Sequence, residues 1–215
     1  MSERRIEQGM RAELALRRRV LNGGAEPIGW KVAFNIPAVQ ELLGIDRPLA
    51  GFMTTDGLAQ DGGTWPTRGE PLVAEPEVGV EIGADGRSIA ALLPALEISD
   101  PPDLALSLDA MLAGNLFHRA VAFGPRVEAD APGPARFLVN GELQAEVDSE
   151  GTRAHLGPMV EVIAGRLSDA GEQLRPGDRI ITGVIAPPTP VEDGDTVRRE
   201  IEEVGAVELG FGALQ

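Results

Sequence analysis

The stretch from Ala74 to Glu81 constrains the fold most strongly, because acidic and apolar residues alternate along it. Read as a β-strand, it has an apolar face and an acidic face, and the acidic face carries Glu75, Glu77 and Glu81. Carboxylates two residues apart on one face lie close enough to share a divalent cation such as Mg²⁺ or Mn²⁺. The same pattern is typical of an edge strand whose glutamates face water. The spacing alone leaves both interpretations open.

A third carboxylate is available at Glu97, within the mostly apolar run Leu92–Ile98. Three carboxylates without histidine or cysteine suit cations that prefer oxygen ligands, and they leave positions for water and substrate. A metal held in this way can bind a 2-oxo acid through its carboxylate and keto oxygens and stabilise an enolate. Glu75, Glu77 and Glu97 are therefore the candidate metal ligands, and Mg²⁺ or Mn²⁺ is the candidate cofactor.

Lys31 stands out because 18 of the 19 basic residues are arginines. It lies in the strand-like segment 28–34, which is otherwise apolar. Lysine is a compact point charge that can lose its proton when it is desolvated, whereas arginine stays charged. A lysine that extends into water from a strand edge is the alternative, but we favour a functional residue that orients the substrate, transfers a proton or neutralises enolate charge.

The composition limits the class of protein. The length of 215 residues suits one sizeable core. The net charge of −15 argues against nucleic acid and anionic membranes as partners. No apolar run is long enough for a membrane span, we find no signal peptide, and the absence of cysteine excludes disulfides and thiolate chemistry. We expect a cytoplasmic protein.

The hydrophobic pattern predicts an α+β fold with a large mixed or antiparallel sheet. Helices are expected at 3–21, 37–43, 104–113, with Asp103 as its N-terminal acid, and 158–170. Strands are expected at 28–34, 49–53, 74–81, 119–123, 136–139, 142–147 and 178–183, followed by a hairpin over 196–211. A further strand is expected between the turn at 84–87 and residue 97. We expect residues 1–24 to form an N-terminal helix and residues 25–215 a single catalytic domain.

Three further polar residues, one threonine and two histidines, lie in local patterns that bear on function. Thr182 ends a strand before Gly183, a good place to bind a carboxylate, although an ordinary strand-terminal threonine fits equally. His118 and His155 lack metal-like spacing, and we interpret both as surface or helix-start residues rather than catalytic bases. No G-x-S-x-G motif and no phosphate-binding loop occurs, which argues against serine hydrolases and NTPases.

Several segments carry motif-like sequences in a fixed order: Gly29–Val32, Ala38–Pro48, Ala74–Val78, Pro94–Ile98, Leu174–Gly183 and Pro190–Asp195. They are similar, in turn, to G-x-K-[IV]-G, V-Q-x-x-L-G-[IV]-x-x-P, I-E-A-E-[IV], P-A-L-E-[IV], L-x-x-G-D-x-[IV]-x-T-G and P-V-x-x-G-D. In this combination the chain resembles the 2-keto-4-pentenoate hydratase / 4-oxalocrotonate decarboxylase family, within the fumarylacetoacetate hydrolase superfamily.

The resemblance implies a mixed-sheet β-roll flanked by helices. It also implies a metal on the three glutamates, Lys31 in the active site and substrate contacts from Thr182, Gly183 and Asn115. The partners it implies are a small 2-oxo acid and further copies of the chain in a homo-oligomer.

Departures from the family pattern bear on the reaction. Hydratases of the family carry an aspartate after the proline in P-D-[FY]-G, where an acid can activate water, but this chain has Leu49 there. That form is closer to the decarboxylases. The family's A-D-N has Gly114 in place of its acid, and the segment at Gly157 lacks an aligned histidine. Pro76 lacks an N–H, so we expect it at a strand start, bulge or edge.

The leading hypothesis is a metal-dependent lyase acting on a small, enolisable 2-oxo acid through a metal-stabilised enolate. Decarboxylation or isomerisation is slightly favoured over hydration. The alternatives are a hydrolase that cleaves C–C bonds of acylpyruvates, with Glu81 or Asp100 as its base, a non-catalytic assembly subunit, or a remodelled natural-product tailoring enzyme.

Overall fold

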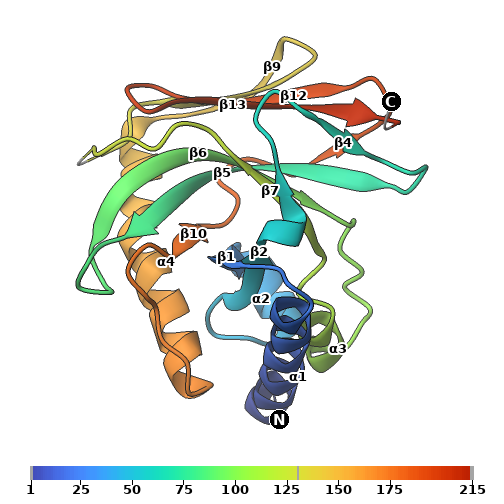
Figure 1. Ribbon diagram of the computed structural model, residues 1–215, viewed down its shortest axis with the longest axis vertical. Helices are drawn as coiled ribbons and strands as arrows, with labels where there is room; N and C mark the ends of the chain where they lie inside the picture. The colour runs from blue at the N-terminus through green and yellow to red at the C-terminus, as the bar shows by residue number, and fades with distance from the viewer. Residues whose placement is uncertain (1, 130, 214–215) are drawn as a thin grey trace.

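A computed structural model describes residues 2–129 and 131–213, which form two β-sheets and flanking helices (Figure 1). The helices are α1 Ser2–Asn22, α2 Pro37–Leu43, α3 Leu108–Ala113, α4 Ser149–Asp169 and the 3-10 helix η1 Thr55–Gly57. Sheet A contains β1 Pro27–Ala33, β2 Leu49–Thr54, β3 Leu58–Ala59, β5 Leu72–Ile82, β6 Ile89–Ser99, β7 His118–Phe123, β10 Arg179–Ile181 and β11 Thr189–Val191. Sheet B contains β4 Thr64–Pro66, β8 Ala135–Val139, β9 Glu142–Val147, β12 Thr196–Ile201 and β13 Gly205–Gly212.

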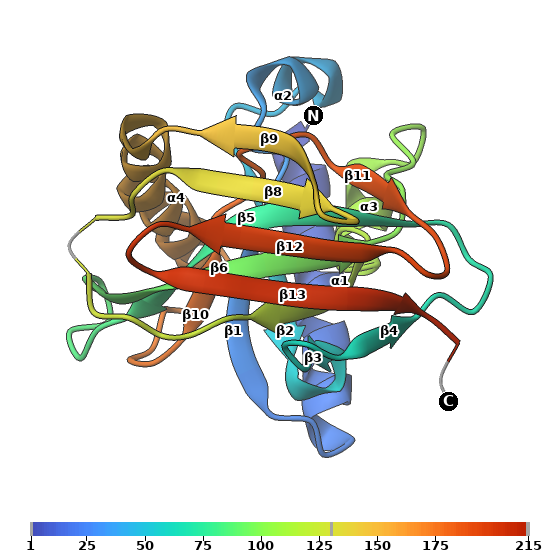
Figure 2. The ribbon, with the colours of Figure 1, turned by 90° about the horizontal axis from the view of Figure 1, so that it is seen from above.

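The strand order confirms the mixed α+β prediction. Sheet A runs β2-β1-β10-β5-β6-β7-β3, with β11 paired to β5, and sheet B runs β4-β13-β12-β8-β9. The β1–β10, β3–β7 and β4–β13 pairs are parallel, and the other strand pairs are antiparallel. Sheet B lies over β5 and β6 (Figures 1 and 2). Helices α1, α2 and α3 lie on the other side of sheet A (Figure 1).

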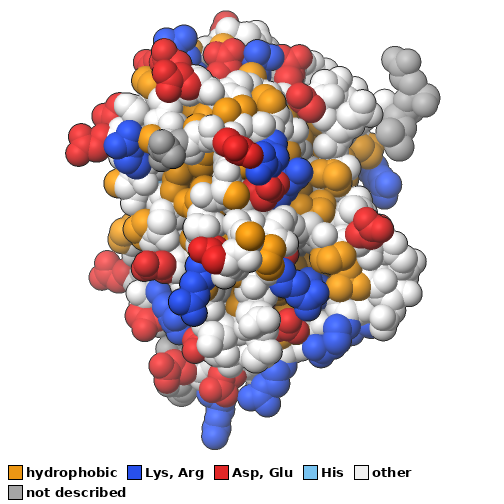
Figure 3. Space-filling view, turned by 60° about the vertical axis from the view of Figure 1, so that its left-hand side comes forward, with side chains coloured by type: hydrophobic (Ala, Val, Ile, Leu, Met, Phe, Trp, Pro, Cys, Tyr) orange, Lys and Arg blue, Asp and Glu red, His pale blue; other side chains and the backbone are white. Residues whose placement is uncertain are grey.

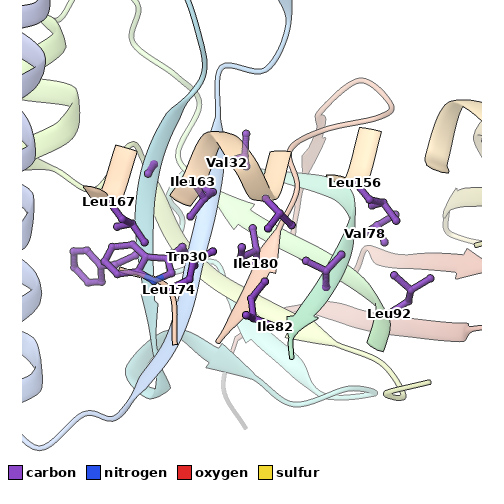
Figure 4. Packing of buried hydrophobic residues seen from close by; sticks show 14 of the residues in the cluster. Trp30, Val32, Val78, Ile82, Leu92, Leu156, Ile163, Leu167, Leu174 and Ile180 are labelled. Atoms are coloured by element: carbon purple, nitrogen blue, oxygen red, sulfur yellow. The ribbon is translucent and has the colours of Figure 1, made fainter. Parts of the chain in front are cut away.

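The two faces of β5 have different environments, as the alternation predicts. Val78 and Val80 join Val32, Ile180 and side chains of α4 in one hydrophobic cluster. Figure 4 shows Leu156, Ile163 and Leu167 of α4 packed over the strands in this cluster. A second cluster, between the two sheets, includes Leu96, Ile98, Phe137, Val197 and Val207. The glutamate face of β5 therefore points away from both clusters, into the concave side of the curled sheet A.

Helix α1 confirms the helix predicted at 3–21 and packs against α3 and β2. Its residues Ile6, Met10 and Leu14 are buried. Gly9 allows the close approach to α3, because an added Cβ would lie 2.7 Å from Cβ of Leu112. The division of the chain after residue 24 stays a prediction.

Two helix predictions are wrong at their starts. The helix predicted at 104–113 begins only at Leu108, because the carboxylate of Asp103 accepts a hydrogen bond from the Ala105 N–H and closes a turn instead. The helix predicted at 158–170 begins at Ser149, with Asp148 as its N-cap and Pro158 inside it. Proline removes one helical hydrogen bond, and the buried Leu156 and Val160 on either side of it supply the packing that offsets this loss.

Pro76 lies in the middle of β5 rather than at its start. On one side it is paired with Leu96 of β6. On the other side, β11 pairs with β5 up to Ala74 and β10 begins at Gly79. Pro76 therefore occupies a local gap in the ladder, where a missing N–H leaves no strand partner unsatisfied.

The surface mixes charges of both signs. On the face shown in Figure 3, acidic and basic side chains are interspersed with hydrophobic ones. None of the helices in the described ranges combines the length and the hydrophobicity needed to cross a membrane.

Candidate metal centre

Glu75, Glu77 and Glu97 come together on the concave face of sheet A. Glu75 on β5 is directly opposite Glu97 on β6, and Glu77 is two residues further along β5. One oxygen from each carboxylate lies within 4.8 Å of the other two. Glu77 is 0% exposed and Glu97 is 1% exposed, so the interpretation of a solvated edge strand is wrong. The strand is central in the sheet because β10 and β6 flank it.

Each carboxylate is anchored through one of its oxygens. Oε1 of Glu75 accepts a hydrogen bond from the Ser99 hydroxyl. Oε2 of Glu77 accepts one from the Gly183 N–H at 2.6 Å. Among the described residues, no hydrogen bond reaches the other oxygen of either glutamate, and Oε1 of Glu77 is buried without a partner. The anchors fix the orientation of both carboxylates and leave one oxygen of each free for a cation.

Glu97 is held by two groups at a single oxygen. Its Oε1 accepts a hydrogen bond from Nζ of Lys31 and lies 2.8 Å from Nδ1 of His118. Nζ of Lys31 also donates to the carbonyl oxygen of Leu116 at 3.2 Å. Lys31, which is almost fully buried, reaches Glu97 from β1 only because sheet A curls. The solvent-exposed alternative for this lysine is therefore wrong.

The electrostatics of the cluster favour an added cation. Burial raises the pKa of Glu77 well above its ordinary value, and it raises the pKa of Glu75, with the charge of Glu97 adding to both shifts. Burial also opposes ionisation of Glu97, but Lys31 and His118 outweigh it and lower the pKa of Glu97. For Lys31 burial is outweighed by the three glutamates, chiefly Glu97, and its pKa is raised. Three carboxylates thus share one ammonium, and an oxygen-preferring divalent cation fits the remaining negative charge.

Comparison with known proteins agrees with this geometry. The model of the fumarylacetoacetate (FAA) hydrolase C-terminal family matches residues 43–211. The chain belongs to this family. The TodF product hydratase of Pseudomonas putida is 27% identical, over 90% of this chain and 79% of that protein.

Solved structures share the fold of this FAA hydrolase family member. The 4-oxalocrotonate decarboxylase from Pseudomonas putida G7, in complex with magnesium and adipate, matches with a TM-score of 0.84 at 21% identity. That match covers 94% of this chain and 84% of the decarboxylase. Fumarylpyruvate hydrolase from Pseudomonas aeruginosa, in complex with Mn²⁺ and pyruvate, matches with a TM-score of 0.63 at 17% identity, over 86% of this chain and 89% of that one.

The predicted substrate-binding residues have structural partners of their own. The Thr182 hydroxyl donates to the Val78 carbonyl at 3.0 Å, and the Gly183 N–H is used by Glu77. The side-chain amide of Asn115 both donates to and accepts from the backbone of Phe52, at 2.9 Å in each case. Direct substrate contacts from these three residues stay predictions, and the contacts observed here instead position the cluster and its surroundings.

The interpretation of both histidines as surface or helix-start residues is wrong. His118 begins β7, its side chain is 6% exposed, and its Nδ1 contacts Glu97. His155 lies within α4, where its Nε2 is hydrogen-bonded to the Thr182 carbonyl and burial lowers its pKa. Local sequence also does not indicate that Ser99 anchors the Glu75 carboxylate. Ser99 and His118 are strand partners across β6 and β7, so their place beside the glutamates depends on a pairing that local sequence does not reveal.

A left-handed turn at Asn115–Phe117 supports the cluster. Its three residues have φ angles of 57°, 53° and 66°, a conformation that costs non-glycine residues roughly 1–2 kcal/mol each. The turn directs the Leu116 carbonyl to Lys31, and the Phe117 carbonyl accepts from the Asp100 N–H at 2.9 Å. Such a strained run persists only where surrounding contacts fix it, and here these contacts belong to the site.

Proposed function

We propose that this protein is a metal-dependent lyase that acts on a small, enolisable 2-oxo acid. The observation that carries the proposal is the glutamate cluster itself: buried carboxylates anchored through one oxygen, beside a buried lysine. The cluster borders a cavity of about 130 Å³ that both Lys31 and Glu75 line. The similar hydratase, decarboxylase and hydrolase, two of them in complex with divalent metals, support the same class of chemistry.

Glu75, Glu77 and Glu97 would hold Mg²⁺ or Mn²⁺ through their unengaged oxygens. When bound there, such an ion supplies Lewis-acid polarisation of a chelated 2-oxo acid. The rigid anchors at Ser99 and Gly183 keep the carboxylates in place as substrate enters. The choice between the two ions, and assembly into a homo-oligomer, stay predictions.

Lys31 is suited to donate a proton or to neutralise developing negative charge. An ammonium has three N–H donors, and Glu97 and the Leu116 carbonyl use two of them. Among the described residues the third has no acceptor, so it can donate to a substrate oxygen in the cavity that Lys31 lines. Because the neighbouring glutamates raise the pKa of Lys31, it stays an ammonium at neutral pH in this arrangement. It therefore acts as an acid or an electrostatic partner rather than as a Schiff-base nucleophile.

Among lyase reactions, we favour decarboxylation or isomerisation over hydration. Leu49, at the position where hydratases of the family carry an acid, is fully buried in an apolar cluster with Ile6 and Met10. It offers no group to activate water. The test is to incubate the protein with magnesium and 2-oxo-enoate substrates while following both diene absorbance and carbon dioxide. Loss of absorbance without carbon dioxide or an isomeric product would contradict this preference, and turnover that survives metal chelation would overturn the proposed mechanism.

A hydrolase of acylpyruvates is the second candidate, because one of the two carboxylates suggested as its base does reach the cavity. Asp100 lines the cavity, although its Oδ1 accepts from Nε of Arg119 at 2.7 Å. Glu81 is instead held by Arg126 at 2.8 Å on the protein surface. Chromatography of the products formed from an acylpyruvate decides between the candidates: two carboxylic acids indicate hydrolysis.

A further inference from the structure

The reactions favoured above both need a group that moves a proton at a carbon atom. Isomerisation takes a proton from one carbon and returns it to another, and decarboxylation places a proton on the carbon that loses carbon dioxide. Among the described residues that line the cavity, the ionisable side chains are Lys31, Glu75 and Asp100. Glu75 is a candidate metal ligand, and Lys31 is paired with Glu97. Asp100 is therefore the group that remains to move a proton at carbon.

Asp100 is anchored through one carboxylate oxygen, as the glutamates are. Its Oδ1 accepts a hydrogen bond from Nε of Arg119 at 2.7 Å, and among the described residues no hydrogen bond reaches its Oδ2. The backbone is fixed as well, because the Asp100 N–H donates to the Phe117 carbonyl at 2.9 Å, within the left-handed turn. These two contacts orient the carboxylate and leave one oxygen able to accept a proton.

The position of Asp100 suits proton transfer beside the metal centre. Asp100 directly follows Ser99, whose hydroxyl anchors Glu75, and both residues line the same cavity. The side chain of Asp100 is 35% exposed, whereas Glu77 and Glu97 are buried. A proton taken up by Asp100 can therefore exchange with water through the exposed part of the carboxylate, while its other contacts keep it directed at the ligand.

We propose that Asp100 is the catalytic base that moves a proton at C3, the carbon next to the keto group of a bound 2-oxo acid. Oδ2 takes the C3 proton, the electron pair of the broken C3–H bond becomes the C2=C3 double bond, and the keto oxygen takes the negative charge. The third N–H of Lys31 is the donor available to that charge. Return of the proton to C3 reverses the step, and its delivery to C5 of a 4-enoic acid completes an isomerisation.

This inference rests on the proposed function, because it assumes that the carboxylate and keto oxygens of the ligand bind at the glutamates. Hydrogen–deuterium exchange at C3 of 2-oxobutanoate tests the step apart from the full reaction. The full chain is incubated with Mg²⁺ in D₂O, and proton NMR follows the loss of the C3 methylene signal relative to Mg²⁺ alone. The wild-type protein is expected to accelerate this exchange.

Asp100→Asn is expected to slow the protein-catalysed exchange by about 100-fold, because a positioned general base contributes roughly 10²–10⁴ in rate. Asparagine keeps an oxygen acceptor for Arg119, so the variant is compatible with folding. Calorimetry should show that Asp100→Asn still binds 2-oxobutanoate in the presence of Mg²⁺. Glu70→Gln is the matched control, since Glu70 pairs with the same arginine at 3.3 Å but lies outside the cavity wall, and it should exchange at the wild-type rate.

Three outcomes would overturn this inference and leave the proposed function standing: equal exchange by wild type and Asp100→Asn, an equal loss in Glu70→Gln, or Mg²⁺-dependent binding without exchange by wild type. Loss of binding in Asp100→Asn would also overturn it, because Asp100 would then hold the ligand rather than move a proton. Absence of both Mg²⁺-dependent binding and exchange in wild type would overturn the proposed function and this inference with it. A base that only activates water, as in the hydrolase candidate, predicts no effect of Asp100→Asn on exchange.

Discussion

The glutamate cluster and Arg199 both bury charge completely, but they differ in what surrounds the charge. Arg199 lies on the inner face of β12, between the sheets, and is 0% exposed. Its guanidinium has no hydrogen-bond partner among the described residues, and burial lowers its pKa to about 10. The glutamates instead have an anchor on one oxygen each and a neighbouring cavity. Burial alone therefore does not identify a site, whereas oriented, partly unsatisfied ligands beside an opening do.

The largest expected effect is at the ion pair within the cluster. Lys31→Met leaves Glu97 buried with His118 as its remaining partner, and loss of one member of a buried pair costs about 3 kcal/mol of unfolding free energy. Urea denaturation of the metal-free protein measures this loss. In the double variant Lys31→Met, Glu97→Gln the loss is expected to be smaller than the sum of the single losses. Strict additivity would show that the two residues do not stabilise each other.

Glu77→Gln tests the cluster as a metal site. Removing one charged ligand is expected to weaken Mn²⁺ binding by about 100-fold, because affinity at oxygen sites depends on ligand charge. Calorimetric titration measures this affinity. Glu81→Gln is the matched control, since Glu81 lies on the same face of the same strand but is paired with Arg126. Similar losses in both variants would show that total negative charge, rather than the cluster, attracts the ion.

The sequence predicts the part of this site that depends on local periodicity. Glu75 and Glu77 share a face because a strand has a period of two residues, the bias towards arginine singles out Lys31, and Glu97 is the carboxylate in an otherwise apolar run. The sequence alone does not place His118 beside Glu97, because that contact requires the β6–β7 pairing and a register shift between Ile98 and Ser99. Leu116 and Phe117 carry no signal for a left-handed backbone, which such residues rarely adopt. Tertiary contacts decide these features.

Arg199→Met is expected to raise the free energy of unfolding, whereas Lys31→Met in the cluster is expected to lower it. Replacing a buried, unpaired guanidinium by an apolar side chain of similar length removes a desolvation cost, so the free energy of unfolding should rise by about 2 kcal/mol. Arg198→Met is the control, because Arg198 faces outward and forms exposed ion pairs with Glu200 and Glu208 that contribute little. If Arg199→Met is destabilising while Mn²⁺ affinity also changes, Arg199 supports the glutamates and the contrast between the two regions is lost.

The smallest expected effect is the pH response of His155, whose Nε2 is hydrogen-bonded to the carbonyl of Thr182, the residue before Gly183. Burial lowers the pKa of His155, and its hydrogen bond to Thr182 only partly opposes this shift. As the pH falls below the ordinary histidine pKa of about 6.5, the unfolded chain takes up a proton that the folded protein does not. Stability contributed by His155 is therefore full above that pH and lost below it.

His155→Leu should remove this contribution, so the difference in unfolding free energy between wild type and variant should change by up to about 1 kcal/mol between pH 7.5 and 5.5. Glu75 and Glu77 act in the opposite direction, because their raised pKa values favour proton uptake by the folded state as the pH falls. Both glutamates are present in wild type and variant, so the difference isolates His155. A difference that does not vary with pH would show that His155 acts through packing alone.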